Sequence, residues 1–431
     1  MSFTKKTIRD VDVKDKKVLV RVDYNVPLDA AGNIRDDYRI QQSVPTLQYL
    51  LEHGAAVILC SHLGRPGGKP DPAYSLFPAA EALGKYLHTE VKFVSDAVGE
   101  RAKSAAQQLQ PGQVLLLENI RFYPGEEGRD EQFAKELASL ADIFVQDAFG
   151  VVHHGAVSVD ELPKHLPSAA GLLLEKEVHT ITEAMENPKR PLVAVIGGAK
   201  IADKIEILQR FLDTADAVVV GGAMANTFLH ATGLKVGKSK IEPDDLPLAK
   251  EIMHKVSEIK KQRDFVFYLP QDGVVASKID PAAPTRIVDW SAHVIAEIEA
   301  YPKRPLQESS QVADHELILD IGPFSGAFVA GLLQLAATVI WNGTMGVTET
   351  KSLLGATGPT AQGTELLTEA LLGQFGNRPF SIVGGGDTVG FVQQRGLTNS
   401  FDHVSTGGGA SLELMSGRKL PGVEALEDKN A

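Results

Sequence analysis

The feature that most constrains the fold is a regular alternation of short apolar runs with longer segments of helical periodicity. The runs are rich in Val, Ile and Leu, as expected for strands that are covered on both faces. Such alternation predicts a parallel sheet with right-handed crossovers. In the first half we expect strands at residues 18–22, 55–60, 91–94, 114–117 and 143–145, and helices at 39–52, 76–87, 96–109 and 131–140.

The second half repeats this alternation, so the chain of 431 residues should form two or three domains. Between the halves, residues 171–186 show helical spacing and predict a rigid connector. An ordinary crossover helix is the alternative. The expected strands of the second half are 192–196, 217–220, 265–268, 317–319, 338–341, 381–383 and 403–405, and its helices include 201–212 and 248–259.

Basic side chains follow the expected strands of the first half. His62 and Arg65 come after the second strand, Arg121 follows the fourth, and Arg39 opens the first helix. The carboxyl ends of parallel strands share one edge of a sheet, where ligands bind. Arginine forks suit carboxylates and phosphates, so this edge predicts a site for a small, multiply anionic ligand. Each arginine alone could equally be a solvated surface charge, and Arg21 could lie within its strand.

Glycine turns follow the expected strands of the second half. Residues 384–386 are three glycines followed by Asp387 and Thr388, and residues 407–409 are three more. Glycines let an anion approach the free N–H groups of a helix start. The alternative is that they only make tight turns. We prefer a magnesium-nucleotide site, because two such triplets lie close together and one leads into Asp-Thr.

Four further positions fit a nucleotide. Lys200 and Lys204 follow a strand and two glycines, and their spacing places both on one helical face, which suits a polyphosphate. Asn342 could donate to a phosphate, and Glu349 could accept from a ribose hydroxyl. Neither a Walker-A string nor a G-x-G-x-x-G string occurs, which argues against a P-loop enzyme and an NAD dehydrogenase.

Composition limits which binding partners and which cellular compartment we expect. The formal net charge of −12 argues against nucleic-acid and membrane-surface binding. The single cysteine, Cys60, cannot form an internal disulfide and fits a reducing cytoplasm. We see no signal peptide and no apolar run near the length that spans a bilayer.

A series of short motifs runs along the chain in one order: RVDYNVP, DDYRI, SHLGRPGG, LLENIRFYPGEE, VQDAFG, GGAKIADKI, LPQDGVVA, DIGP, WNGTMGV, GGGDT and STGGGASLELMSGRKLPGV. Taken together, these motifs resemble phosphoglycerate kinase over essentially the whole chain. The resemblance implies two Rossmann-like domains with parallel sheets, joined by a connector helix, with a tail that returns to the first domain. The implied domains are 1–170 with 416–431 for phosphoglycerate, 171–187 for the connector, and 188–415 for the nucleotide.

The resemblance also implies reversible phosphoryl transfer between 1,3-bisphosphoglycerate with MgADP and 3-phosphoglycerate with MgATP. Arg39 and Lys200 would act on the moving phosphoryl group, and Asp387 would bind Mg²⁺. The implied substrate residues are Asp23, Asn25, Arg39, His62, Leu63, Gly64, Arg65, Arg121 and His154. The implied nucleotide residues are Gly198, Ala199, Lys200, Lys204, Asn342, Glu349, Gly385, Gly386, Asp387 and Thr388.

Some positions depart from the family pattern. His154 stands where the family has an arginine that contacts the substrate phosphate, and no arginine lies between Arg129 and Arg190. Histidine cannot form the bidentate fork, so we expect weaker phosphate binding or a shifted substrate preference. Other departures concern the nucleotide side, at Asn226, Ile318, Phe324 and Thr344.

Two alternatives stay open at this point. One is a kinase of another small anionic acceptor, and the other is a non-catalytic relative. Retention of both Arg39 and Lys200 argues against the non-catalytic relative. From the family we expect a cytoplasmic monomer that acts on small molecules and binds neither nucleic acid nor membrane.

Overall fold

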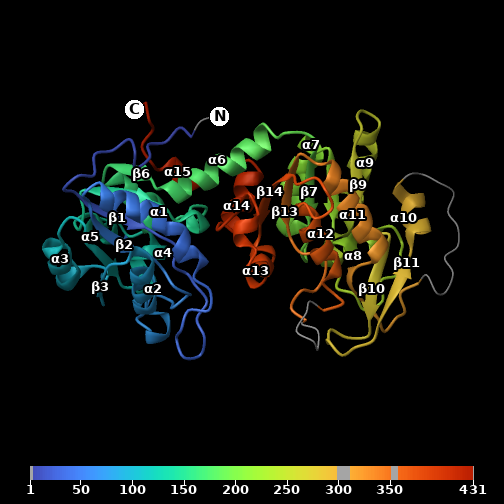
Figure 1. Cartoon of the computed structure of the whole chain (residues 1–431), viewed down its shortest axis with the longest axis horizontal. Helices are drawn as coiled ribbons and strands as arrows, with labels where there is room; N and C mark the ends of the chain where they lie inside the picture. The colour runs from blue at the N-terminus through green and yellow to red at the C-terminus, as the bar shows by residue number, and fades with distance from the viewer. Residues whose placement is uncertain (1–2, 299–310, 351–357, 431) are drawn as a thin grey trace. The chain divides into compact units, whose positions relative to one another are not determined.

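The computed structural model describes residues 3–298, 311–350 and 358–430. The chain forms two compact units (Figure 1). Unit 1 comprises Met1–Thr182 and Gly409–Ala431, and unit 2 comprises Glu183–Gly408. Unit 1 therefore includes helix α14 (Gly409–Met415), which the sequence boundary at residue 415 assigns to the other half.

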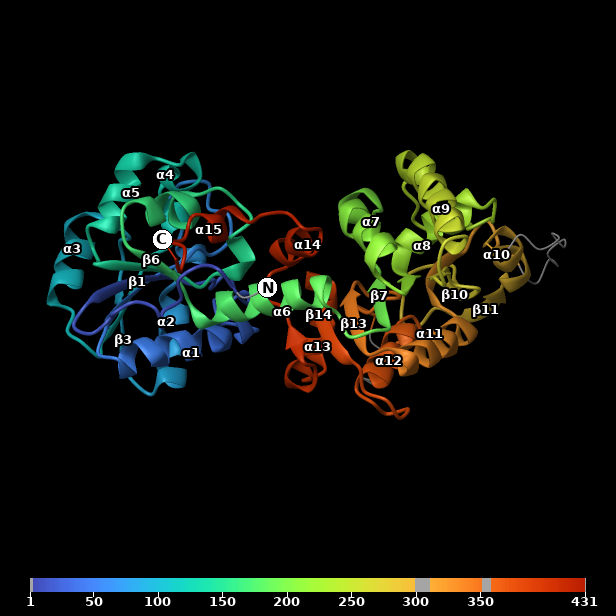
Figure 2. The same cartoon turned by 90° about the horizontal axis from the view of Figure 1, so that it is seen from above.

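Unit 1 is built on a six-stranded sheet in the order β3-β4-β2-β1-β5-β6. All five strand pairs are parallel, which confirms the predicted sheet. Helices α1 and α2 lie on one face and α4 and α5 on the other (Figure 2). The strands are β1 (Lys17–Arg21), β2 (Ala56–Cys60), β3 (Val91–Val94), β4 (Val114–Leu117), β5 (Ile143–Gln146) and β6 (Ser168–Ala170). The helices are α1 (Tyr38–Glu52), α2 (Phe77–Leu87), α3 (Gly99–Gln108), α4 (Pro124–Gly128) and α5 (Glu131–Ala138).

The continuous apolar runs become central strands because both of their faces are covered. All five residues of β2 are buried, and α1 adds Ile40, Leu47 and Leu50 to the same core. Truncating a leucine that is this well buried costs about 2–5 kcal/mol of stability. The core therefore fixes where each strand ends, and the loops that follow the strands start from rigid positions.

Unit 2 contains a second six-stranded sheet, in the order β15-β14-β13-β7-β8-β9, and all of its pairs are parallel. Helices α7, α8 and α9 cover one face, and α11 and α12 the other (Figure 2). The strands are β7 (Leu192–Ile196), β8 (Ala217–Val220), β9 (Val266–Tyr268), β13 (Thr338–Asn342), β14 (Phe380–Gly384) and β15 (His403–Val404). The helices are α7 (Ile205–Thr214), α8 (Gly222–Ala231), α9 (Leu246–Lys260), α10 (Ser291–Ile298), α11 (Pro323–Leu335), α12 (Gln362–Leu371) and α13 (Gly386–Gln394).

A third sheet in unit 2 was not predicted. Strand β10 (Asp272–Ala276) pairs antiparallel with both β11 (Thr285–Asp289) and β12 (Leu317–Ile321). The run at 317–319 is therefore a strand, as predicted, but it belongs to this small antiparallel sheet. A short apolar run looks the same in either setting, so periodicity alone could not separate the two.

The expected connector is helix α6 (Leu172–Glu186), which spans the boundary between the two units. Its first turn is fixed from unit 1. Asp147 Oδ1 accepts hydrogen bonds from the backbone N–H groups of Leu173 and Leu174, at 3.0 and 3.2 Å. A carboxylate at a helix start satisfies free N–H groups and favours the helix dipole.

The C-terminal tail packs onto unit 1, as predicted. Helix α15 (Pro421–Glu424) is followed by Leu426, which is buried. Lys5 near the N-terminus donates hydrogen bonds to the carbonyls of Glu424 and Leu426 and forms an ion pair with Asp428. The two ends of the chain therefore close unit 1 together. No helix of the described residues is long and apolar enough to cross a membrane.

Candidate functional site

The carboxyl edge of the sheet in unit 1 gathers the predicted substrate residues. Strands β4, β2 and β1 are direct neighbours in the sheet, so the loops that follow them leave side by side. Gly64 joins these loops: its N–H donates to Asn25 Oδ1 at 3.0 Å, and its carbonyl accepts from Arg121 Nη1 at 2.9 Å. A side chain at Gly64 would collide with the ring of Tyr74, because a Cβ there would lie 2.3 Å from it. The turn therefore needs glycine.

Arg39 is positioned by an acid on the same edge. Its Nη1 donates to Asp23 Oδ2 at 2.8 Å, while about a third of the arginine side chain stays exposed. Burial by itself would raise the pKa of Asp23, but the charges of Arg39 and Arg21 outweigh it and hold that pKa below its usual range. Arg65 is exposed on the same loop as Gly64. The edge thus presents cations to solvent, and the buried carboxylate of Asp23 orients Arg39 among them.

Two buried residues, Asn119 and Arg21, contact the predicted substrate residues Leu63 and His62 from the protein interior. The side-chain amide of Asn119, which sequence reasoning missed, donates to the carbonyls of Leu63 and Tyr74 at 2.7 and 2.9 Å. Leu63 itself is buried, so it can only offer backbone groups. Arg21, left open by the sequence, is the last residue of β1 and is also buried, where it contacts His62. An Asn two residues after the predicted strand at 114–117 was a usable signal for the first of these.

His154 lies exposed beside His153, and the two ring centroids are 3.7 Å apart. Burial and the neighbouring ring lower the pKa of His153 to about 4, so His153 is neutral at physiological pH. His153 also packs against Gly409, where a Cβ would lie 2.8 Å from its Nε2. One glycine of the second triplet is therefore explained by packing within unit 1.

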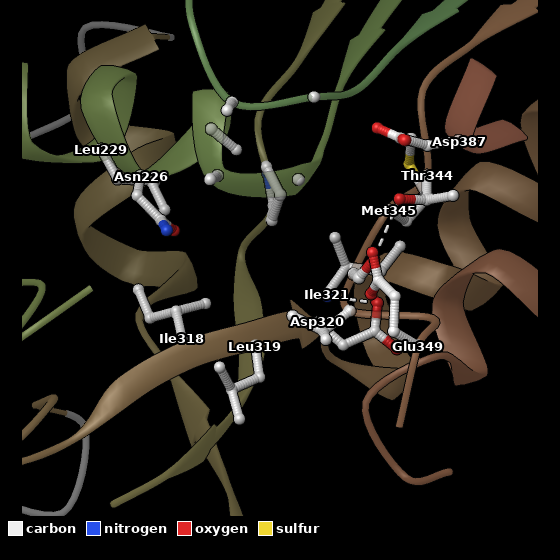
Figure 3. A pocket seen from close by; sticks show the side chains of 18 of the residues that line it. Asn226, Leu229, Ile318, Leu319, Asp320, Ile321, Thr344, Met345, Glu349 and Asp387 are labelled. Atoms are coloured by element: carbon white, nitrogen blue, oxygen red, sulfur yellow. Dashed lines mark hydrogen bonds between the residues drawn. The ribbon is translucent and has the colours of Figure 1, made fainter. Parts of the chain in front are cut away.

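Unit 2 holds a pocket at the carboxyl ends of β7, β8 and β13 (Figure 3). Of the predicted nucleotide residues, Gly198, Ala199, Glu349 and Asp387 line it. Asn226 and Ile318 lie on one side of the opening, and Thr344 and Glu349 lie across from them (Figure 3). The pocket also includes Leu229 and Trp290, which sequence reasoning missed because they carry no motif.

Of the four departures on the nucleotide side, Asn226, Ile318 and Thr344 line this pocket, whereas Phe324 does not. Phe324 is instead 56% exposed on α11. The three lining residues therefore shape the pocket directly. Phe324 has no part in its wall.

Two glycines at the strand ends beside this pocket are packed against neighbouring backbone. A Cβ at Gly197 would lie 2.2 Å from the carbonyl oxygen of Thr344, and one at Gly343 would lie 2.3 Å from the carbonyl carbon of Gly197. Gly343 also has a φ of +114°, which favours glycine. These two glycines are thus required by close backbone packing. Gly386 differs, because a Cβ there would meet open space.

Lys204 lies beside these glycines and does not line the pocket. Its Nζ donates to the carbonyl of Gly197, the carbonyl of Asn342 and Asn342 Oδ1, at 2.7, 3.0 and 2.7 Å. An ammonium has three donors, so all of them are used within the protein. Burial lowers the pKa of Lys204 to about 8, although Asp387 and Asp203 act in the opposite direction. Lys200, by contrast, is exposed.

Asn342 is oriented by Lys204. Because an ammonium can only donate, the side-chain oxygen of Asn342 faces Lys204, and its Nδ2 faces away. Nδ2 is buried and has no hydrogen-bond partner within the described part of the chain. A buried amide donor without a partner is costly, and an anionic ligand would satisfy it.

The first glycine triplet leads into helix α13 as predicted. Gly385 has a φ of +86° and caps the helix, and Asp387 is exposed in the first turn. Thr388 is buried, and its hydroxyl accepts a hydrogen bond of 2.7 Å from the N–H of Gly343. Among the described residues no three His, Cys, Asp or Glu side chains group as a metal site. Mg²⁺ usually needs only one or two carboxylates plus phosphates and water, so Asp387 alone fits that chemistry.

Comparison with known proteins identifies the family. Residues 8–418 match the sequence profile described as phosphoglycerate kinase. A phosphoglycerate kinase of Chloroflexus aggregans is 48% identical over 428 residues, which cover 99% of this chain and 100% of the relative. One from Moorella thermoacetica is 44% identical, again over 99% of this chain and 100% of the relative.

Solved structures agree with the sequence comparison. The phosphoglycerate kinase of Coxiella burnetii superposes with a TM-score of 0.80 at 35% identity, covering 98% of each chain. That of Pyrococcus horikoshii gives a TM-score of 0.78 at 28% identity, again over 98% of each chain. The predicted α/β fold and the predicted enzyme class are thereby confirmed. The chain therefore belongs to the phosphoglycerate kinase family, kinases that transfer phosphate between ATP and the carboxyl group of 3-phosphoglycerate.

Proposed function

We propose that unit 1 binds the phosphoglycerate and unit 2 binds the magnesium nucleotide. The observation that carries this assignment is the junction at Gly64, which ties the loops of Asn25 and Arg121 together on one edge of the sheet. The proposed acceptor residues are Asp23, Asn25, Arg39, His62, Leu63, Gly64, Arg65, Arg121 and His154. The proposed nucleotide residues are Gly198, Ala199, Lys200, Lys204, Asn342, Glu349, Gly385, Gly386, Asp387 and Thr388.

Within the nucleotide set the contacts support different tasks. Asn342 Nδ2 and the helix start at Gly386, where a Cβ would meet open space, suit the phosphates. Glu349 on the pocket wall suits a ribose hydroxyl. Lys204 acts from beneath by holding Asn342, because its donors are already used. Asp387 would hold Mg²⁺, which neutralises phosphate charge when it is bound.

The chemical step needs placement and charge neutralisation more than covalent chemistry from the protein. The nucleophile is a carboxylate or an ADP oxygen, and neither needs a general base. Arg39 would neutralise charge on the transferred group from the acceptor side, and Lys200 from the donor side. Arg39 is held for this through Nη1, which contacts Asp23 Oδ2 at 2.8 Å and the carbonyl of Asn25 at 3.4 Å, and about a third of the side chain stays exposed.

A coupled assay with 3-phosphoglycerate and MgATP tests this proposal. Lys200→Ala should lower turnover on the order of a hundredfold or more, because a charge that acts in the transition state is removed. Lys250→Ala, at an exposed position on α9, is the matched control and should behave as wild type. Equal turnover of the Lys200 variant and the control would refute the role of Lys200.

A cytoplasmic monomer completes the proposal. The one cysteine, Cys60, is buried as a free thiol, which is compatible with a reducing compartment. Sedimentation velocity over a wide range of protein concentration tests the oligomeric state. A concentration-dependent second species would contradict the monomer.

A further inference from the structure

We infer that Arg21 is a positioning residue that holds His62 as the neutral tautomer with its N–H on Nε2, so that His62 offers a fixed hydrogen-bond donor to the acceptor substrate. This inference rests on the proposed role of His62 in binding phosphoglycerate. The resemblance to the family gave Arg21 no role, and the alternation of its strand left its direction open.

The tautomer follows from one contact. Arg21 Nη2 lies 3.2 Å from His62 Nδ1, and both side chains are buried. A guanidinium has five donors, no acceptor, and no accessible deprotonated form. Nδ1 must therefore accept, which requires it to carry no proton. The single N–H of the neutral ring is then on Nε2.

Arg21 is itself locked in place. It ends β1 directly beside the end of β2, where Arg21 pairs with Cys60. Its Nη1 donates to the carbonyl of Val22, and its Nε donates to Ser158 Oγ at 2.9 Å. A guanidinium held at several points leaves the imidazole no freedom to turn over.

Glu126 compensates the positive charge of Arg21 through Ser158, which contacts both residues. Ser158 Oγ donates to Glu126 Oε1 at 2.6 Å, and the backbone N–H of Ser158 donates to Glu126 Oε2 at 3.0 Å. Burial raises the pKa of Glu126, while Arg21 and the bonds from Ser158 oppose that shift. Glu126, Ser158, Arg21 and His62 thus form one continuous hydrogen-bonded chain that leads to the substrate edge.

The groups around His62 keep it neutral. Burial lowers its pKa well below the usual range, and the positive charges of Arg21, Arg121 and Arg39 act in the same direction. Asp23 opposes them and does not prevail. Across the part of the chain that the structure describes, Nε2 makes no hydrogen bond, so its proton remains for a ligand. A carboxylate or phosphate oxygen accepts such a proton.

The test is a long-range ¹H–¹⁵N spectrum of the full chain labelled at histidine, with the His62 signals assigned by their loss in His62→Gln. In wild type we expect His62 as the Nε2–H tautomer throughout pH 6–8. In Arg21→Met we expect a mixture of tautomers and a KM for 3-phosphoglycerate that rises about tenfold, by analogy with the lower end of the loss seen when a partner that orients a metal-ligating histidine is removed. Arg101→Met, a surface arginine of the same unit, is the control.

The outcomes separate this inference from the proposed function. A wild-type His62 that carries its proton on Nδ1, or a tautomer unchanged in Arg21→Met, overturns the inference even if KM rises. An altered tautomer with an unchanged KM shows that Arg21 has no positioning role. If His62→Ala leaves the KM for 3-phosphoglycerate unchanged, the proposed role of His62 fails, whatever the spectrum shows. Should Arg21→Met not fold, Arg21→Gln serves, because a neutral amide can accept as well as donate and no longer fixes the tautomer of His62.

Discussion

The two proposed anion-binding edges are built from different groups. In unit 1 the proposed ligand groups are long cationic side chains, and Asp23 and the turn at Gly64 hold Arg39 and Arg121 among them. In unit 2 the edge includes closely packed glycine backbone, and its partly buried cation, Lys204, donates to oxygen atoms of the protein. From this difference we expect that removing a charged side chain impairs the edge of unit 1, whereas adding a side chain at a glycine impairs the edge of unit 2.

The largest expected effect tests the cationic edge. Arg39→Met should lower turnover by about 10³-fold, by analogy with arginines that stabilise the charge of phosphoryl transfer. The loss should appear in kcat more than in the KM for ATP. Arg101→Met gives the baseline for removing an arginine from the same unit. A loss below about tenfold would mean that Arg39 binds substrate without acting on the transition state.

Added bulk tests the glycine edge. Gly343→Ala places a Cβ 2.3 Å from the backbone of Gly197 at a φ of +114°, and should cost about 3 kcal/mol of unfolding free energy. Gly386→Ala adds the same methyl group in open space and should cost little stability. Denaturant unfolding of both variants measures the contrast. Equal losses would show that the glycines of unit 2 do not differ in their packing.

The pH dependence of stability tests whether Lys204 belongs to the interior. Its folded pKa of about 8 lies below the ordinary lysine value of 10.5, so the unfolded state binds more protons between these values. Stability of wild type relative to Lys204→Met should therefore rise as pH increases from 8 toward 10.5, by about 3 kcal/mol at most. A difference that is flat across this window would place Lys204 in solvent.

The smallest expected effect concerns position 154, where this chain has a histidine in place of the family's arginine. His154→Arg should lower the KM for 3-phosphoglycerate on the order of tenfold, because a guanidinium can form a bidentate pair with phosphate. His53→Arg, exposed at the end of α1, adds the same charge elsewhere and should change nothing. An unchanged KM in His154→Arg would count against a binding deficit at this position.

Sequence reasoning reached most of the fold because buried parallel strands are continuous apolar runs. Strands β3, β4, β7 and β8 begin and end where they were predicted. The antiparallel sheet escaped because β11 is mostly exposed and carries no such run. The motifs also predicted the positions of the strand-end loops. They did not predict which side chains of these loops face solvent and which face the protein interior.

Lys204 shows why the direction of a side chain could not be predicted from the motif. Two lysines four apart were expected on one helical face, yet residues 202–204 form a 3₁₀ turn and α7 begins only at Ile205. Helical periodicity therefore does not apply to this pair, and the ammonium instead meets three oxygen atoms at the strand ends. Arg21 shows the same limit, since its partners Ser158 and His62 are distant in sequence.

The shared closure of the two chain ends has a consequence for biosynthesis. Unit 2 is one uninterrupted stretch, whereas unit 1 needs its last residues to cover Lys5 and Val152. During translation the second unit to be made can thus complete its core while the first still awaits the tail. The tail must therefore leave the ribosome before the core of the segment that was made first is fully covered.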